Sequence, residues 1–484
     1  MRYLLRKFGE FNGLNVPAVI SNIRDLIGKE IILEHRYKDV LEFDDLIIIQ
    51  NYNRYNSREL VSTVLKFRKK NIGKLIYLPG PFNPYDFPTL FYLGVDILDT
   101  SFIDAMGDRN CIYPTGINKG ENCREWNKNL LNKIMKEIEI SLKTYNFREL
   151  VEFYSNTAFS QEILRLLDME YYNEIKQFID HEPRNLSSSG IESIFRPEFR
   201  EYRERVMNFR SKANNLLLIP CSAIKPYSMS KSHRVLHSFI GKYLKYIDEV
   251  IVTSPLGLVP REIESFYPAA YYDIPVTGYW FEEEKKMLRE TAESYFRNKK
   301  YDKVFYILPE GEDVILDIFE EKIGIKGKLN AENSSKLQQL MEKELVRSKV
   351  NKRKVEIINI ISYHYGIVLN DENMKIVDQG NRELVYINDT VFAKITKNGP
   401  YPMMGLAQYL ASNGIKVIKI RESVKSSNIF MPVVEDISND VRPGDLVIVL
   451  NNEKIEGFGY AAISKYDLDY LRRGIAVRDF KRLQ

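Results

Sequence analysis

The stretch PCSAIKPYSMSKSH, residues 220–233, gathers side chains that can act as nucleophile, acid or ligand contact. It holds a thiol at Cys221, an amine at Lys225 and an imidazole at His233. A thiol beside a lysine and a helix start can have a depressed pKa and attack an electrophile, whereas a buried structural cysteine is inert. The residues alone leave both interpretations of Cys221 open.

The same stretch is predicted to be a loop that faces a ligand. Pro220 ends an apolar run and Pro226 opposes a simple helical continuation, so backbone N–H groups and hydroxyls can point outward. A helix is expected to begin near Ser230 or Ser232, because either serine can cap it. The N-terminus of that helix favours anionic or polar ligand groups.

A second group of residues lies in TSPLGLVPRE (253–262) and YPAAYYDIPVTGYW (267–280). Glycines and prolines break regular structure here, and the tyrosines offer flat faces on which a nucleobase could stack, although such aromatic residues are more often core. Asp273 lies among them. Its carboxylate could read the donor edge of a purine-like base or simply cap a turn, and the residues leave both possibilities open.

Three apolar runs must position these loops, and they are NLLLIP (215–220), DEVIVTS (248–254) and DKVFYILPE (302–310). They alternate with amphipathic stretches, including a helix expected from 281 to 299, which predicts a parallel α/β sheet. Each run ends in polar or turn residues, at the edge where open α/β sheets place ligands. A long charged helix is expected around residues 331–350.

The rest of the chain divides by pattern. The first ~115 residues alternate apolar runs with amphipathic stretches, which predicts βα units in a sheet or barrel. Residues 121–180 have leucines and isoleucines at helical spacing, and a linker rich in Pro, Ser and Gly predicts a boundary near 185–200. The final ~67 residues carry short β-like runs, typical of a small β module.

Composition sets the class of protein. A chain of 484 residues is expected to form about three or four domains. Its hydrophobic fraction of 44% and charged fraction of 28% are those of a globular protein, and no apolar stretch approaches the ~20 residues of a membrane span. The N-terminus lacks a signal-peptide pattern. Cys111, Cys123 and Cys221 lie too far apart for a disulfide framework, which predicts a reducing, cytoplasmic location.

The net charge of +4 does not identify a nucleic-acid binder by itself. Positive charge is concentrated in RSKVNKRK (347–354) and in the C-terminal tail RRGIAVRDFKRLQ. These segments could contact phosphate or form a solvated surface.

Together, PCSAIKPYSMSKSH, SPLGLVPRE and YPAAYYDIPVTGYW resemble the archaeosine synthase family, archaeal tRNA-modifying relatives of tRNA-guanine transglycosylase. LPGPFNPYDFPTLFYLGVDILDTS resembles a transglycosylase-like half barrel, and residues 429–464 resemble a PUA domain. The resemblance implies an α/β multidomain fold. Its expected parts are a degenerate, TIM-derived transglycosylase-like domain with a helical extension (1–190), a doubly wound α/β catalytic domain (191–345), a small α+β domain (346–416) and a PUA β-barrel (417–484).

The resemblance also implies a reaction. In this family the tRNA D-loop carries preQ0 (7-cyano-7-deazaguanine), and free lysine adds to its nitrile through the side-chain amine. A radical-SAM partner, the beta subunit, then cleaves the adduct. Either Lys225, Tyr227 or His233 could donate the proton, with His233 favoured near neutral pH. Alternatively, Cys221 forms a thioimide that the amine displaces.

The other open alternatives are glutamine-dependent amidinotransfer to the same base, a non-catalytic tRNA-binding paralogue and a transglycosylase that inserts preQ0. The catalytic residues implied are Cys221, Lys225 and His233. The substrate-binding residues implied are Ser222, Tyr227, Ser230, Ser232, Ser254, Arg261, Glu262, Asp273 and Thr277. The RNA-binding residues implied are Arg442, Gly444, Gly457, Gly459 and Arg473.

The sequence departs from the transglycosylase pattern in two places. The first 185 residues contain no convincing counterpart of the Asp nucleophile, so base exchange is not expected. Only Cys111 and Cys123 remain of the zinc ligands, so no metal or other cofactor is expected and lysine is a co-substrate. The expected partners are preQ0-containing tRNA, free lysine, the radical-SAM beta subunit and a possible second copy of the chain, with no membrane.

Overall fold

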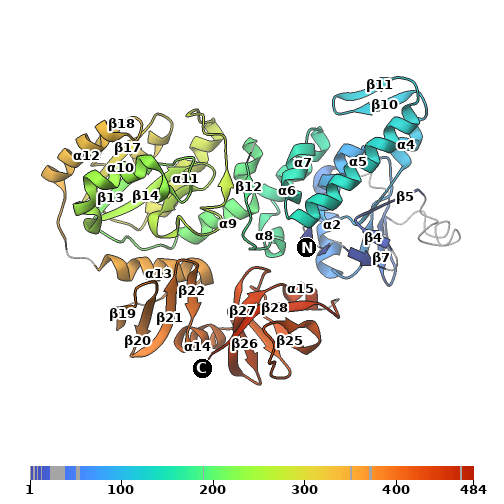
Figure 1. Cartoon of the computed structure of the whole chain (residues 1–484). Helices are drawn as coiled ribbons and strands as arrows, with labels where there is room; N and C mark the ends of the chain where they lie inside the picture. Colours follow the sequence, from blue (N-terminus) through green and yellow to red (C-terminus); the bar gives the residue numbers. More distant parts are fainter. Residues whose placement is uncertain are drawn as a thin grey trace. The chain divides into compact units, whose positions relative to one another are not determined.

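The computed structural model describes residues 2–3, 6–7, 9–11, 14–21, 39–50, 55–188, 190–348, 351–369, 373–468 and 471–483. The chain forms two compact units, Met1–Asp180 and His181–Gln484 (Figure 1). The first unit therefore ends ten residues before the boundary expected at 190. The fold is mixed α/β and multidomain, as the sequence predicts.

The first unit is built on a five-stranded sheet with the order β5-β9-β8-β7-β6. The first four strands pair in parallel and β6 is antiparallel. Helices follow β7, β8 and β9, as βα units require. The elements of the sheet are β5 (Ala18–Ile20), β6 (Val40–Glu42), β7 (Leu46–Ile49), α2 (Ser57–Lys70), β8 (Leu75–Tyr77), α3 (Phe87–Leu93), β9 (Ile97–Asp99) and α4 (Ser101–Met106).

The remainder of this unit is mainly helical, which confirms the expectation for residues 121–180. The helices are α5 (Cys123–Thr144), α6 (Phe147–Tyr154), α7 (Ala158–Met169) and α8 (Tyr172–Ile175). Short strand pairs precede the sheet and these helices, namely β1 (Arg2–Tyr3) with β2 (Arg6–Lys7), β3 (Gly9–Phe11) with β4 (Leu14–Val16), and β10 (Asn110–Tyr113) with β11 (Gly116–Lys119). The derivation of this unit from a TIM barrel stays a prediction.

Cys111 and Cys123 form a disulfide, so the expectation that the cysteines lie too far apart to pair is wrong. The β10–β11 hairpin returns the chain to its starting point and brings the two Cα atoms to 4.6 Å. A Cβ on Gly120 would lie 3.1 Å and 3.2 Å from the two sulfurs, so this position suits glycine. The spacing of the cysteines in the sequence does not by itself predict that a hairpin brings them together.

The second unit begins with a five-stranded sheet in the order β15-β14-β13-β17-β18. Strands β14, β13, β17 and β18 are parallel, and β15 is an antiparallel edge. The elements are β12 (Leu186–Ser187), α9 (Pro197–Val206), β13 (Asn215–Pro220), α10 (Lys231–Ile240), β14 (Ile247–Thr253), β15 (Gly257–Pro260), β16 (Tyr272–Asp273), α11 (Glu282–Phe296), β17 (Lys303–Leu308), β18 (Ile323–Lys326) and α12 (Ala331–Glu344).

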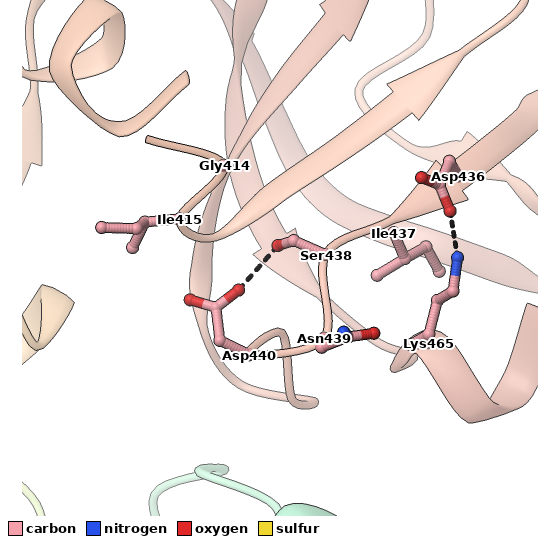
Figure 2. Close-up of a pocket in the computed structure, with 8 residues that line it drawn as sticks. All are labelled: Gly414, Ile415, Asp436, Ile437, Ser438, Asn439, Asp440 and Lys465. Carbon is pink, nitrogen blue, oxygen red and sulfur yellow. Dashed lines mark hydrogen bonds and ion pairs between the residues drawn. The ribbon is translucent and has the colours of Figure 1, made fainter. Parts of the chain in front are cut away.

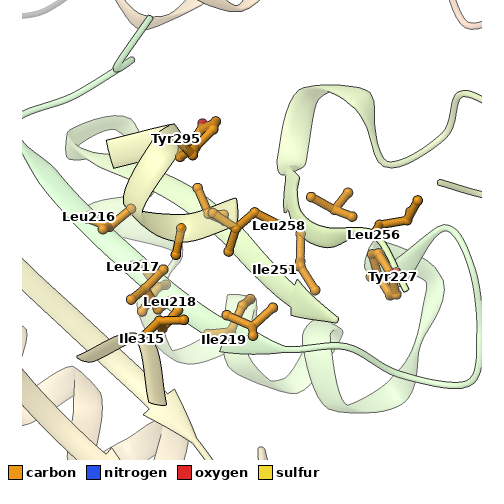
Figure 3. Packing of buried hydrophobic residues seen from close by; sticks show 14 of the residues in the cluster. Leu216, Leu217, Leu218, Ile219, Tyr227, Ile251, Leu256, Leu258, Tyr295 and Ile315 are labelled. Carbon is orange, nitrogen blue, oxygen red and sulfur yellow. The ribbon is translucent and has the colours of Figure 1, made fainter. Parts of the chain in front are cut away.

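The helices of this sheet cover both faces. The chain leaves β13 through α10 to reach β14, then crosses back through α11 to reach β17 on the other side of β13. Because such crossovers are right-handed, opposite directions of travel place α10 and α11 on opposite faces. All residues of β13 are buried, as expected for a strand covered on both sides. Figure 3 shows Leu216–Ile219 of β13 within the core that also contains Tyr295 and Ile315.

Two smaller parts follow in the same unit. Helix α13 (Lys352–Tyr365) and α14 (Met404–Ser412) accompany an antiparallel sheet of β19 (Met374–Asp378), β20 (Glu383–Ile387), β21 (Thr390–Thr396) and β22 (Gly399–Pro402). The helix expected at 331–350 is α12, which ends at Glu344, and α13 is a further helix that begins at Lys352. A six-stranded sheet with α15 (Lys465–Leu468) ends the chain, formed by β23 (Val417–Ile420), β24 (Ile429–Phe430), β25 (Val434–Ile437), β26 (Leu446–Asn451), β27 (Lys454–Ala461) and β28 (Ile475–Arg482).

A charged cluster joins this C-terminal module (residues 417–483) to helix α9. Arg442 makes two hydrogen bonds with the carboxylate of Glu201, at 2.8 Å and 2.6 Å. His181 contacts Glu201 at 3.1 Å and Asp445 at 2.7 Å, and Arg205 also binds Glu201. Arg205, His181 and Arg442 hold the pKa of Glu201 well below its usual range, despite the opposing effect of burial. Glu201 is therefore ionised and paired in the folded protein.

We expect Glu201→Gln to lower the free energy of unfolding by about 3 kcal/mol at pH 7, because it leaves buried cations without their anion. The carboxylate's contribution is present above the ordinary Glu pKa of about 4.3 and is lost as the pH falls through the lowered folded-state pKa. The difference between variant and wild type should thus shrink below about pH 4. Urea unfolding at several pH values measures it, and Glu204→Gln on the exposed side of α9 is the control.

Candidate active site

The loops that carry the predicted site leave the carboxyl ends of parallel strands. Residues 221–229 follow β13, Ser254 follows β14 and residues 309–312 follow β17. Because the chain leaves β13 in one direction and returns to its other side, the strand order reverses between β13 and β17 (Figure 1). Open α/β sheets bind ligands in the crevice at such a point.

Cys221 lies at the start of the first loop, where its N–H donates to the Val252 carbonyl at 3.0 Å. Burial and, to a lesser extent, the nearby Glu312 charge raise the pKa of its thiol to about 11, against smaller effects from Thr253 and Lys225 that lower it. Of the two interpretations that the sequence leaves open, this raised pKa favours the buried, unreactive thiol. Lys225 stands beside the thiol, but desolvation outweighs its charge, so the thiol stays protonated near neutral pH.

Lys225 is half-buried and lies over an aromatic ring. Its Nζ is 4.1 Å from the centroid of the Tyr272 ring, within the range of a cation–π contact. Burial lowers the Lys225 pKa, while Cys221 and Asp273 oppose that shift. The hydroxyl of Tyr272 is hydrogen-bonded to Tyr227 and to Thr253, both at 2.6 Å. The ring on which the lysine rests is thus fixed from two sides.

His233 faces the protein interior. Its Nε2 lies 3.1 Å from the Pro220 carbonyl, and its Nδ1 lies 2.8 Å from the Arg261 guanidinium. Burial and the Arg261 charge lower the pKa of His233 to about 4. The prediction that His233 is the acid near neutral pH is wrong, because the imidazole is neutral there. The predicted helix start is confirmed: Ser230 accepts a hydrogen bond from the His233 N–H at the first turn of α10.

Arg261 and Glu262 are engaged in ion pairs within the protein. Arg261 binds Glu249 and Glu264, and Glu262 binds Lys212 and accepts from the Asn359 amide at 2.8 Å. Tyr227 is fully buried, and burial raises its pKa, with a smaller contribution from its hydrogen bond to Tyr272. The sequence suggested that these three side chains contact the substrate. Their polar groups instead bind other residues of the protein, so these side chains hold the loops in place.

The remaining predicted contacts differ in their burial. Ser222 donates to the Ile224 carbonyl at 2.8 Å, and Ser232 lies 3.4 Å from Ser230. Asp273 and Thr277 are exposed. Ser254 is buried, and its hydroxyl has no hydrogen-bond partner in the described structure.

Glu312 is a further site residue that sequence reasoning missed. It lies just after β17, on the other side of the strand reversal from Cys221, and only 6% of it is exposed. Burial and the neighbouring Asp313 raise its pKa to about 8, and its Oε2 atom has no hydrogen-bond partner among the described residues. The sequence signal for this residue is the acidic run PEGED (309–313), which lies at the carboxyl end of the third predicted strand.

The structure places the predicted RNA contacts of the C-terminal module in different surroundings. Arg442 is occupied by Glu201, with 13% of its side chain exposed, and Gly444 packs against the backbone of His181 and Glu182. A Cβ on Gly457 or Gly459 would collide with β28, so these glycines allow two strands to approach closely. Arg473 is exposed, as an RNA contact requires.

A surface pocket of about 690 Å³ lies elsewhere in the second unit (Figure 2). Its lining residues are Gly414, Ile415, Asp436, Ile437, Ser438, Asn439, Asp440 and Lys465. Asp436 is paired with Lys465, and Asp440 accepts from Ser438 at 2.7 Å. The charged groups of this pocket are therefore largely satisfied by one another, and it contains none of the predicted substrate residues.

The described residues lack two kinds of feature. They contain no cluster of three or more His, Cys, Asp or Glu side chains placed to hold a metal ion. Within the same part of the chain, no helix is both long and apolar enough to span a membrane.

Comparison with known proteins gives matches along nearly the whole chain. A family described as a domain of unknown function (DUF5591) matches residues 199–351. The chain is 29% identical to archaeosine synthase subunit alpha of Thermoplasma acidophilum, over 96% of this chain and 94% of that protein. It is 28% identical to archaeosine synthase of Methanocaldococcus jannaschii, over 91% and 81% of the two chains.

More distant matches are partial. The chain is 23% identical to tRNA-guanine(15) transglycosylase of M. jannaschii, over 64% of this chain and 46% of that protein. A solved protein described as of unknown function shares 22% identity, covers 58% of this chain and 99% of its own, and has a TM-score of 0.45. These matches confirm the resemblance to archaeosine synthases that the motifs predict.

Proposed function

We propose that this chain is a tRNA-modifying transferase of archaeosine biosynthesis. The observation that carries the proposal is the similarity to archaeosine synthase subunit alpha over 96% of the chain. The matched region includes the loop of Cys221 and Lys225 at the carboxyl edge of β13. A cytoplasmic location is part of the same proposal.

The proposed reaction joins the side-chain amine of free lysine to the nitrile of preQ0 in the tRNA D-loop. Addition of an amine to a nitrile requires an unprotonated nucleophilic nitrogen and a proton for the nitrile nitrogen as charge develops there. With His233 neutral and Tyr227 buried, Lys225 is the favoured hydrogen-bond donor to the nitrile. Its position over Tyr272 supports this role, because the cation–π contact orients the ammonium at the partly open loop.

Direct addition is favoured over a thioimide on Cys221. With a thiol pKa of about 11, only a small fraction of Cys221 is thiolate at pH 7. The thiolate is the nucleophilic form, so a covalent route would need a base that takes the thiol proton first.

The base needs a flat platform once it leaves the D-loop stack. The loop between β16 and α11 carries Tyr279, of which 88% is exposed. An exposed tyrosine ring can stack on a nucleobase of any kind. We assign this loop to contact with the D-loop, and Ser222, Asp273 and Thr277 to polar contacts at its edge.

The proposal includes partners. The name of the T. acidophilum relative, subunit alpha, supports a second subunit, which in the proposed scheme is the radical-SAM enzyme that cleaves the lysine adduct. The C-terminal module is proposed to hold tRNA in the manner of a PUA domain.

We expect the purified chain to add one whole lysine to preQ0-containing tRNA, because nitrile addition releases no atoms. Mass spectrometry of the digested tRNA measures the gain. Glutamine-dependent amidinotransfer would instead add only ammonia from glutamine. A transglycosylase would exchange labelled guanine and give no lysine adduct, and a non-catalytic tRNA-binding paralogue would bind tRNA without any product.

We expect Cys221→Ser to reduce the turnover number for lysine addition by less than about tenfold, because the buried thiol is not the nucleophile. If Cys221 formed a covalent thioimide, the loss would exceed about 1,000-fold, since removing a catalytic nucleophile has effects of that order. Single-turnover kinetics with preQ0-tRNA separate the two results.

We expect Arg473→Ala to weaken tRNA binding several-fold and to reduce the slope of log K against log salt by about 1, as for the loss of one phosphate contact. Arg473→Lys keeps the charge and serves as the control. Binding titrations between low and moderate salt measure both quantities. An unchanged salt slope for Arg473→Ala would remove this residue from the tRNA contact.

A further inference from the structure

Glu312 is a buried carboxyl group without a cation. It is 6% exposed, and in the described part of the chain no ion pair joins it to a lysine, arginine or histidine. One of its oxygens, Oε2, has no hydrogen-bond partner there. An ionised carboxylate in such a place is costly unless a positive charge accompanies it. The site therefore favours a ligand that brings its own cation.

The groups around Glu312 do not supply that charge. On its own segment, Asp313 pairs with Lys326 of β18 at 2.8 Å and adds a second negative charge. From the β13 loop and from β16, Cys221 and Tyr272 lie close enough for the Glu312 charge to raise both of their pKa values. Lys225, the cation of this group, rests on the Tyr272 ring and forms no ion pair with Glu312.

We propose that Glu312 binds the primary ammonium group of the incoming amino acid and carries its proton to the nitrile nitrogen. The proposal rests on the function proposed above and adds the residue that receives the amine. The ligand class is a primary alkylammonium. Glu312 follows β17, and Lys225 lies in the loop after the neighbouring strand β13. The amine and the nitrile would therefore meet between these two loops.

The proton and bond balance closes without another reactant. The Glu312 carboxylate accepts a proton from the ammonium, which leaves a neutral amine. The amine nitrogen bonds to the nitrile carbon as one C–N π bond breaks, and the proton on Glu312 passes to the nitrile nitrogen. Glu312 then takes a second proton from the attacking nitrogen and passes it to the same nitrile nitrogen. The product is an amidinium, and Glu312 ends as the carboxylate that began the cycle.

The protonation state of Glu312 gives this step a pH dependence. Burial and Asp313 raise the Glu312 pKa to about 8, so the free enzyme carries a neutral carboxyl below that pH. The productive pair, carboxylate with ammonium, exists mainly between this pKa and the ordinary lysine pKa of about 10.4. The value of kcat/KM for lysine should therefore rise with pH up to about 8, because this parameter reports the ionisations of the free reactants.

We expect Glu312→Gln to lower kcat/KM for lysine at pH 8 by at least 100-fold, as for loss of an acid–base group, and to abolish the rise toward pH 8. Glu310→Gln, an exposed carboxylate two positions away, is the matched control and should stay within twofold of wild type. Retained tRNA affinity shows that Glu312→Gln is folded. A folded variant with the wild-type pH profile would overturn the inference.

A second measurement does not depend on turnover. Removing the Glu312 charge should lower the Cys221 pKa, so iodoacetamide should alkylate Cys221 at least threefold faster in Glu312→Gln than in wild type at pH 9, measured by peptide mass spectrometry. Equal rates would show that Glu312 does not face the site. A wild-type chain without lysine transfer would overturn the proposed function and this role together, whereas an active wild type with an unaffected Glu312→Gln variant overturns only the role of Glu312.

Discussion

The parallel pairing of β14, β13 and β17 is the constraint on which the second unit depends. Because β13 and β14 are buried along their whole length and β17 along most of it, their side chains belong to the core, and chemistry is left to the loops at the carboxyl ends. The reversal of strand order between β13 and β17 then separates two of these loops. Cys221 and Lys225 come from one loop and Glu312 from the other, so groups about ninety residues apart in the chain share one edge.

Desolvation sets the chemical character of this edge. The same exclusion of water raises the pKa of Cys221, raises that of Glu312 and lowers that of His233. Each group is pushed toward its neutral form, as burial requires when no opposite charge compensates. At neutral pH the thiol is therefore protonated and the imidazole is neutral. The Glu312 carboxyl, with a pKa of about 8, is the group that changes its protonation state close to neutral pH.

The sequence predicted the parts of the structure that depend on local pattern. The three apolar runs became β13, β14 and β17, Ser230 caps α10, and residues 121–180 are mainly helical. It failed where distant segments decide the outcome. The Cys111–Cys123 bond needs the return of a hairpin, the role of Arg442 needs Glu201 some 240 residues away, and no local pattern distinguishes a buried Glu312 from a surface carboxylate.

The close approach of Gly444 to the chain at His181 and Glu182 has a consequence for protein engineering. A Cβ at this glycine would lie 2.5 Å from backbone atoms, and the neighbouring Pro443 carbonyl accepts a hydrogen bond from the His181 N–H at 2.7 Å. Transplanting residues 417–483 onto another scaffold would therefore have to carry the 181–182 peptide and a Glu201 equivalent with them. Residues 181–182 and 417–483 therefore limit one another's substitutions, because the backbone contact leaves no space for a side chain at position 444.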